Sequence, residues 1–283
     1  MAEFNQIKRA IKGTPTADGD GVRLTRLIGT HLLPELDPFL LLDHFGSDQA
    51  SDYIGGFPPH PHRGFETVTY MLQGKMRHQD SVGNDGVIED GGIQWMTAGS
   101  GIIHSEMPEQ TAGMLSGFQL WVNLPADAKM TAPKYQENTA AEIPLEERDH
   151  ATRVKVIAGI TNRGTQGIID NDFVNPNYWD VSLPQGSTFT DRLDPKHNAF
   201  VYLYEGQLIV GNSQSIDAGV LTVLTAGDTL LLEATKDSQF IVVSGLPLNE
   251  PVQRAGPFVM NTRQQLQQAF QDYQSGQFIQ QEV

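Results

Sequence analysis

The sequence predicts an all-β protein of two similar antiparallel domains, with one helix near its C-terminal end. Apolar residues mostly alternate with polar ones or come in short runs, the runs end at Gly, Pro, Asn or Asp, and helical patterns are few. At roughly 150 residues per domain, a chain of 283 residues indicates two domains. Hydrophobic residues make up 39% of the chain, which is enough for a core in each.

The clearest strand covers residues 118–124, where Phe118, Leu120 and Val122 occupy alternate positions before Pro125. A turn made of Gly, Asn and Asp at residues 83–86 predicts a hairpin, because these residues tolerate positive φ angles. Further short strands are expected at residues 66–73, 87–89, 154–158, 199–204, 207–210, 229–233 and 240–244.

The strand pattern lapses between residues 126 and 149, so we place the domain junction near residue 140. The predicted domains are residues 1–140 and 141–283. Near the end of the chain, Thr262 and Gln265 can form a capping box for a helix that stops before Gly276. Its apolar stripe is expected to pack on a barrel.

A weak internal repeat relates the two halves. The segment Tyr70–Gly74 matches Tyr202–Gly206 in pattern, and each is followed by a glycine that opens another strand, Gly92 and Gly227. Two copies of one β module fit both the pattern and the length.

Composition excludes several classes of function. The chain has no cysteine, so disulfides, thiolate metal sites and cysteine nucleophiles are ruled out. The formal net charge of −15 repels phosphate backbones and anionic membranes, so neither nucleic acid nor a membrane is an expected partner. The first residues do not resemble a signal peptide, and we expect a cytoplasmic location.

Chemistry concentrates in two short clusters, His60-Pro61-His62 and His104-Ser105-Glu106. On a strand, residues i and i+2 point to the same face, so each cluster can aim two side chains inward. Three imidazoles and one carboxylate could then hold a metal ion and leave two adjacent positions open if the ion is octahedral.

A single His-x-His is more often an ordinary core or surface pair than a metal site, and it is the two clusters together that favour a metal. Glycines surround both clusters, as expected where the backbone turns sharply beside a buried ligand set. They are Gly55, Gly56, Gly64, Gly99 and Gly101.

The segments HPHRGFETVTYMLQG (60–74) and QWMTAGSGIIHSEMP (94–108) resemble the signature of the pirin family, a branch of the cupin superfamily. The resemblance extends through residues 38–46, 245–252 and 256–262. It implies two cupin barrels, that is, double-stranded β-helix or jelly-roll domains. It also implies one divalent metal ion in the N-terminal domain, bound by His60, His62, His104 and Glu106. Fe(II) is the expected ion, with Ni, Cu, Mn and Co as alternatives that these ligands do not separate sharply.

By the same resemblance, Glu66 is expected to lie outside the ligand set, although the general cupin pattern places a ligand glutamate at its spacing. The C-terminal domain is predicted to have no metal site. Aligning the repeats glycine on glycine places Arg192 and Asp194 at the positions of the first His pair, and Gln239 and Ile241 at the positions of the second cluster.

The remaining candidates carry weaker predictions. Asp43 and His44 could support a ligand imidazole, but a structural role is favoured for both. The histidines at 31, 78 and 150 are interpreted as solvent-facing, and Arg77, His78 and Asp80 as a charged surface without chemistry. Aromatic and methionine side chains that could line a pocket are Phe57, Trp95, Met96 and Trp121.

Two functions follow from the resemblance. The first is a flavonol dioxygenase of the quercetin 2,3-dioxygenase type, which cleaves the central ring of the flavonol with O2 and releases carbon monoxide. In this function Glu106 would be both a metal ligand and the base that takes the flavonol hydroxyl proton. The second is an iron-dependent, redox-sensitive interaction module or transcriptional coregulator that binds a protein partner. An open, apolar, flavonol-sized pocket favours the enzyme, and a narrow mouth beside a charged patch favours the module.

Overall fold

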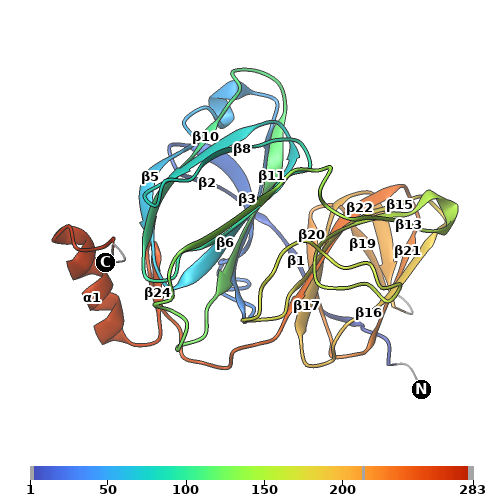
Figure 1. The fold of residues 1–283 in the computed structure, drawn as a ribbon. Coiled ribbons are helices and arrows are strands. Elements are labelled where there is room, and N and C mark those ends of the chain that lie inside the picture. Colours follow the sequence, from blue (N-terminus) through green and yellow to red (C-terminus); the bar gives the residue numbers. More distant parts are fainter. Residues whose placement is uncertain (1–2, 212–213, 280–283) are drawn as a thin grey trace. The chain divides into compact units, whose positions relative to one another are not determined.

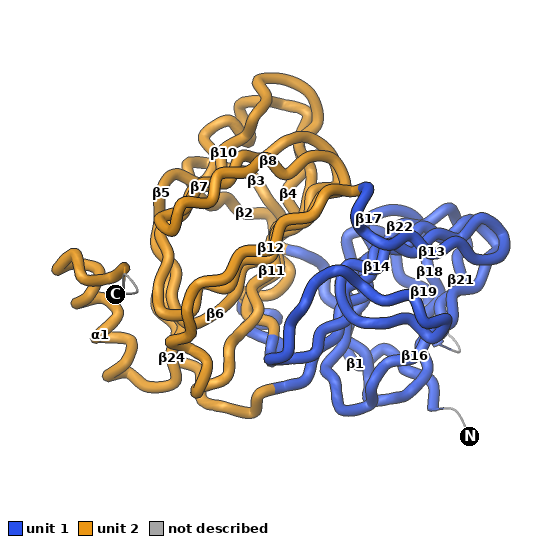
Figure 2. The backbone as a smooth tube through the Cα atoms, in the orientation of Figure 1, with its two compact units in different colours: residues 1–13, 31–38, 141–247 blue, residues 14–30, 39–140, 248–283 orange. Residues whose placement is uncertain are grey.

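The computed structural model describes residues 3–211 and 214–279, whose strands form seven-stranded and four-stranded antiparallel sheets (Figure 1). The chain divides into two compact units, each with one sheet of either size (Figure 2). Unit 1 takes the residues up to 13, residues 31–38 and residues 141–247. Unit 2 takes residues 14–30, residues 39–140 and the residues from 248 onward.

The sheets of unit 2 pack their inner faces against each other. A core cluster joins Leu24 and Phe45 of the larger sheet to Met76 and Ile88 of the smaller one. The larger sheet runs in the order β12 (Lys134–Asn138), β9 (Ile93–Thr97), β6 (Phe65–Gln73), β11 (Leu115–Asn123), β4 (Phe39–Ser47), β3 (Val22–Ile28) and β2 (Thr14–Asp18). The smaller sheet runs in the order β5 (Phe57–His62), β10 (Ile102–Pro108), β7 (Met76–Asp80) and β8 (Asp85–Ile88).

Unit 1 repeats this topology. Its larger sheet runs in the order β1 (Ile7–Lys12), β20 (Val220–Leu224), β17 (Asn198–Glu205), β22 (Ser238–Gly245), β15 (Asn177–Leu183), β14 (Arg153–Ala158) and β13 (Leu145–Glu147). Its smaller sheet runs in the order β16 (Thr188–Arg192), β21 (Thr229–Ala234), β18 (Gln207–Val210) and β19 (Gln214–Asp217). Apart from β1, every strand occupies the place of the strand numbered eleven lower in unit 2, so the units are two copies of one module.

This topology refines the internal repeat. Strands β6 and β17 correspond, as the matched segments predict, and each is followed by a glycine with positive φ, Gly74 and Gly206. The glycine that opens the strand equivalent to β9 is Gly219, before β20, and not Gly227.

The units are not continuous halves of the chain. Residue 140 is a unit boundary, close to the predicted junction, but the N-terminal strand β1 belongs to unit 1. The C-terminal segment, with β23 (Gln253–Ala255), β24 (Phe258–Met260) and α1 (Arg263–Gln274), belongs to unit 2. The physical reason is strand pairing: β1 completes the larger sheet of unit 1 by pairing with β20, in the place that β12 takes in unit 2.

Each of the eight strands named from the sequence corresponds to an observed strand, and its bounds agree to within three residues at each end. The predicted 118–124 strand is the end of β11, and β18 has the predicted bounds. The hairpin joins β7 to β8 through residues 81–84, two residues earlier than predicted, with Gly83 at φ +100°. In neither unit do the paired strands described here close into a continuous barrel.

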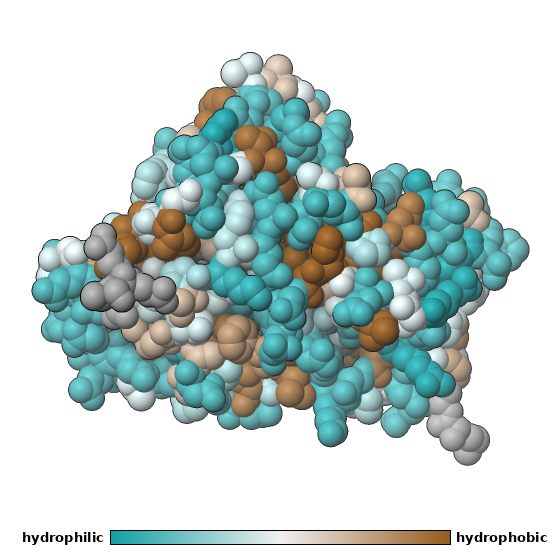
Figure 3. Space-filling model, viewed as in Figure 1, coloured by the Kyte–Doolittle hydropathy of each residue, from teal (hydrophilic) through white to brown (hydrophobic). Residues whose placement is uncertain are grey.

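The C-terminal helix α1 has the predicted capping box. Thr262 accepts a hydrogen bond from the Gln265 backbone N–H, and the Gln265 side chain bonds back to the cap. Arg63, which directly follows strand β5, donates to Asp272 of this helix at 2.6 Å and to the Ser100 carbonyl at 2.6 Å. In the described part of the chain, no helix is long and apolar enough to span a bilayer. Polar side chains cover much of the face shown in Figure 3.

Gly64 fixes the turn that follows strand β5. Its φ is +86°, and a Cβ atom on it would lie 2.0 Å from the Val259 carbonyl oxygen. The buried ammonium group of Lys129 donates to the carbonyl oxygen of Gly64 at 2.8 Å and to that of Val259 at 3.1 Å, and so bridges the two segments. The turn therefore leaves no room for a side chain.

Gly64→Ala is expected to destabilise the protein more than Gly21→Ala does. Gly21 has the same kind of backbone (φ +84°) but nothing within 4 Å of its Cβ position. Gly21→Ala should cost about 1–2 kcal/mol for the left-handed conformation alone. Gly64→Ala should cost about 1–3 kcal/mol more from steric overlap. Urea unfolding of both metal-free variants checks this, and equal losses would contradict it.

Candidate metal centre

Three pairs of polar side chains at spacing i, i+2 share one face of the smaller sheet of unit 2. His104 lies opposite His60 on one side and opposite Asp80 on the other, and Glu106 lies opposite His78. Residues that face each other in register point to the same side of a sheet. The pairs are His60 and His62 on β5, His104 and Glu106 on β10, and His78 and Asp80 on β7.

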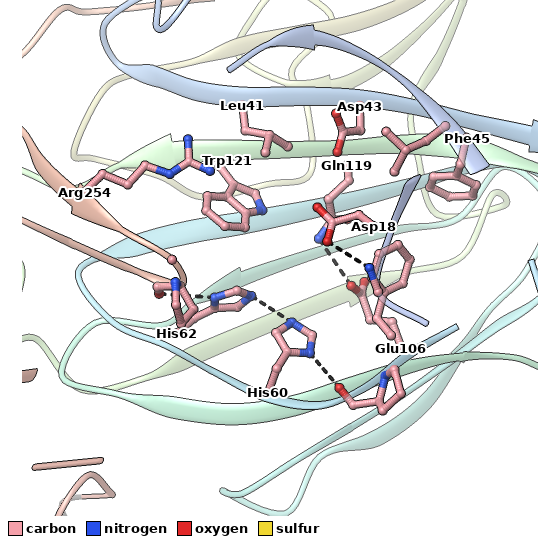
Figure 4. Close-up of a pocket in the computed structure, with 16 residues that line it drawn as sticks. Asp18, Leu41, Asp43, Phe45, His60, His62, Glu106, Gln119, Trp121 and Arg254 are labelled. Carbon is pink, nitrogen blue, oxygen red and sulfur yellow. Dashed lines mark hydrogen bonds between the residues drawn. The ribbon is translucent and has the colours of Figure 1, made fainter. Parts of the chain in front are cut away.

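The structure brings His60, His62 and His104 together, as the two sequence clusters predict. Their nitrogen ligand atoms all lie within 4.8 Å of one another. The Nε2 atoms of His60 and His62 are 3.0 Å apart (Figure 4). The rings of His60 and His104 are 4.4 Å apart between centroids.

The donor chemistry of these rings fits a bound cation. The Nδ1 atoms of His60 and His62 lie 2.8 and 3.4 Å from the carbonyl oxygens of Pro58 and Pro257, which can only accept a hydrogen bond. In the neutral rings each Nδ1 therefore carries the hydrogen, and both Nε2 lone pairs point at each other. Nε2 of His104 is buried and has no hydrogen-bond partner among the described residues. A metal ion would satisfy all three nitrogens.

Burial keeps two of these histidines in the form that binds metals. Desolvation lowers the pKa of His62 and that of His104 well below the usual value, and the neighbouring imidazoles lower both further. Since only the neutral imidazole can coordinate a cation, both side chains are ready ligands at neutral pH.

Glu106 lies on the same face of β10 as His104, but its carboxylate is hydrogen-bonded to the larger sheet of unit 2. Its Oε1 accepts a hydrogen bond from Thr69 at 2.5 Å, and its Oε2 accepts one from Gln119 Nε2 at 3.3 Å. Thr69 and Gln119 face each other on β6 and β11. Glu106 does not belong to the group whose ligand atoms all lie within 4.8 Å of one another, so its role as fourth ligand stays a prediction.

A cavity of about 540 Å³ opens beside the histidines, within the usual range of small-molecule sites (Figure 4). Two of the four residues predicted as pocket lining, Phe57 and Trp121, do line it, whereas Trp95 and Met96 are buried without lining it. Its apolar wall comprises Leu24, Leu41, Phe45, Phe57 and Trp121.

The charged groups around this cavity are largely paired. Arg26 donates to both carboxylate oxygens of Asp43, at 2.8 and 2.7 Å, and to Asp18 at 2.7 Å. Burial raises the pKa of Asp43 in spite of this pairing. The Arg254 guanidinium lies 4.5 Å from the centre of the Trp121 ring. Arg26 therefore holds the two carboxylates that line the cavity, Asp18 and Asp43, which fits the structural role that the sequence favours for Asp43.

The prediction for one histidine and its neighbour was wrong. The side chains of His78 and Asp80 have no exposed surface, and Nε2 of His78 lies 3.1 Å from Oδ2 of Asp80. Only Arg77, the residue before His78 on β7, faces solvent as predicted. The register of β7 turns this pair to the inner face. The signal was present in the sequence, since His78-x-Asp80 has the same i, i+2 spacing as the other two clusters. His31 and His150 are exposed, as predicted.

Glu66 accepts a hydrogen bond from Thr97 at 2.7 Å and, like Glu106, is not part of the histidine group, so its place outside the ligand set stays a prediction.

In unit 1 most inward-facing side chains of the equivalent strands are apolar, and the buried carboxylate of Asp191 on β16 pairs with Arg148. The strands that correspond to β5, β10 and β7 contribute Phe189, Leu230, Leu232 and Leu208 to a buried core cluster. Gln239 and Ile241 lie on β22, the equivalent of β11, so the repeat alignment placed them on the wrong strand. Among the described residues of the chain, no second group of potential metal ligands meets the same distance limit.

Two similar β-sandwich units, one of them with a convergent set of histidines beside a cavity, define a bicupin protein with one candidate metal centre. The pirin family model matches residues 21–122, and the model of the pirin C-terminal cupin domain matches residues 178–279. The chain belongs to the pirin family.

Similar proteins agree with this assignment. The chain is 54% identical over 272 residues to a pirin-like protein of Caulobacter vibrioides, covering 96% of this chain and 98% of that protein. It is 44% identical over 263 residues to a pirin-like protein of Solanum lycopersicum, covering 92% and 88%. A crystal structure of quercetin 2,3-dioxygenase from Acinetobacter baumannii superposes with a TM-score of 0.89 at 36% identity, covering 97% of this chain and 98% of that one.

Proposed function

We propose that the protein is a metal-dependent dioxygenase that cleaves a flavonol such as quercetin with O2 and releases carbon monoxide. The observation that carries the proposal is the convergence of three imidazoles beside a cavity with an apolar wall. The likeness to a structure named quercetin 2,3-dioxygenase supports the same reaction class.

His60, His62 and His104 would hold the metal ion, with Glu106 as the fourth ligand. We propose Fe(II) as that ion. When bound, it would act as a Lewis acid toward a flavonol oxygen and mediate electron transfer to dioxygen.

The protein's own residues bind the substrate and move one proton. The wall of Leu41, Phe45 and Trp121 would hold the planar aromatic rings, since such pockets are mostly apolar with a few placed polar groups. Glu106 would take the proton of the flavonol hydroxyl group as the substrate binds. Gln119 and Thr69 hold the carboxylate of Glu106 toward the cavity through their hydrogen bonds.

Oxygen consumption by the iron-loaded protein tests the proposal. Protein loaded with ferrous salt under anaerobic conditions should consume O2 when quercetin is added, bleach the flavonol absorbance and release carbon monoxide. A flavone that lacks the 3-hydroxyl group should not react, because it offers Glu106 no proton. No oxygen uptake and no bleaching with iron-loaded protein would refute the proposal and leave the interaction module as the remaining function.

A further inference from the structure

The third polar pair of the site, His78 and Asp80, lies directly behind the predicted ligand His104. Nε2 of His78 is 3.1 Å from Oδ2 of Asp80, and Nδ1 of His78 is 3.5 Å from Nδ1 of His104. The side chains of His78 and Asp80 are fully buried, and His104 is 1% exposed. The three residues form a chain of contacts that ends at the buried Nε2 of His104.

The direction of this chain is set by Asp80. Its Oδ1 accepts hydrogen bonds from the backbone N–H groups of Val82 and Asn84, both at 3.0 Å. Its Oδ2 accepts one from Asn84 Nδ2 at 2.8 Å. Because donors surround both oxygens, Asp80 acts only as an acceptor. The hydrogen in the contact with His78 must then sit on Nε2 of His78.

The remaining hydrogens follow from the chemistry of neutral imidazole, which has one donor and one acceptor nitrogen. If Nε2 of His78 is the donor, its Nδ1 is the acceptor. Nδ1 of His104 then donates to it, and Nε2 of His104 is left with a lone pair. That nitrogen is the buried atom without a hydrogen-bond partner in the described part of the structure.

We propose that His78 and Asp80 are positioning residues that lock His104 in the tautomer whose Nε2 lone pair faces the metal site. The inference rests on the proposed metal site, and it assigns a role to residues on β7 that touch neither metal nor substrate. Outer partners of this kind orient a ligand imidazole and fix its tautomer. In His60 and His62, backbone carbonyl oxygens accept the Nδ1 hydrogen and fix the same tautomer. In His104, the side chains of His78 and Asp80 take over this part.

The tautomers can be measured without metal or substrate. Long-range ¹H–¹⁵N correlation spectra of the metal-free, ¹⁵N-labelled protein should show hydrogen on Nδ1 of His104 and on Nε2 of His78. Assignment uses the His104→Gln and His78→Phe variants. Hydrogen on Nε2 of His104 would overturn the inference, whatever the activity of the protein.

Asp80→Asn tests the relay by reversing it. The amide oxygen can keep both backbone hydrogen bonds to Val82 and Asn84. The amide NH2 group takes the place of Oδ2 and presents a donor to His78, and the Asn84 side-chain amide must turn its oxygen toward this group. His78 must then accept at Nε2 and donate from Nδ1, which forces the hydrogen of His104 onto Nε2, where it blocks coordination. Competition with a chelator should show that Ni(II) binds the variant about 10–100-fold more weakly than the wild type.

The matched control is Asp85→Asn, the same change on the same hairpin. Asp85 is 47% exposed, and its carboxylate accepts from Arg77 and Gln79. Its Ni(II) affinity should equal that of the wild type. His78→Phe keeps the ring volume and removes the acceptor, so it should weaken Ni(II) binding as well. Wild-type affinity in both Asp80→Asn and His78→Phe would overturn the inference. A wild type that binds Ni(II) and shows the expected tautomers but does not turn over flavonols would refute only the proposed function.

Discussion

Replacing Glu106 by Ala is expected to lower kcat for quercetin by about 10²–10⁴-fold, the contribution of a positioned general base. The variant loses the carboxylate that would receive the flavonol proton, and it also loses the predicted fourth ligand. Thr69 and Gln119 would keep their places opposite each other on β6 and β11 and retain their mutual contact at 2.6 Å. Steady-state oxygen uptake by protein of known iron content measures the effect.

Two further variants separate the roles of this residue. Glu106→Gln keeps the size of the side chain and can still offer an oxygen to a metal, but it cannot take a proton at neutral pH, so kcat should fall nearly as far as in Glu106→Ala. Glu109→Ala removes an exposed carboxylate of the same segment that pairs with Arg77, and should leave kcat unchanged. If Glu106→Gln turned over quercetin at the wild-type rate, Glu106 would not be the base.

Replacing His104 by Ala is expected to abolish stoichiometric metal binding. His104 supplies one of the three converging nitrogens, and its Nε2 has no other use among the described contacts. The loss in metal affinity should exceed the roughly 10–100-fold that the loss of an outer partner costs. Turnover should disappear with the metal. Metal analysis after gel filtration, together with chelator competition, provides the measurement.

The control for this variant is His197→Ala in unit 1. His197 is also buried, and its Nδ1 lies 3.2 Å from the Ser244 hydroxyl oxygen, far in sequence from any predicted ligand. Metal content and turnover of this variant should match those of the wild type. Full metal content in His104→Ala, or loss of the metal in His197→Ala, would contradict the placement of the metal site in unit 2.

Local patterns in the sequence were sufficient for the eight predicted strands, the helix and the histidine group. Strand alternation depends only on neighbouring residues, and so the i, i+2 rule correctly placed His60 and His62 on one face. The capping box of α1 is equally local, with Thr262 and Gln265 three positions apart. The all-β class and the repeat follow from such patterns as well.

What the sequence could not supply depends on pairing between distant strands. No local rule shows that β1 completes the sheet of the other half of the chain, or that Gln119 of β11 meets Glu106 of β10. The polar residues Arg77 and Gln79 beside His78 predict an exposed side chain, but they face the other side of β7. The burial of His78 is decided by the register of β7 against β10, which only the fold determines.

The central claim is that His60, His62 and His104 hold one metal ion. Anomalous diffraction at the iron edge, from crystals soaked in ferrous salt under anaerobic conditions, tests it most directly. We predict a single strong peak within bonding distance of all three Nε2 atoms and of a Glu106 oxygen, and no peak in unit 1. Iron elsewhere, or no peak between the three imidazoles at saturating ferrous salt, would contradict the claim.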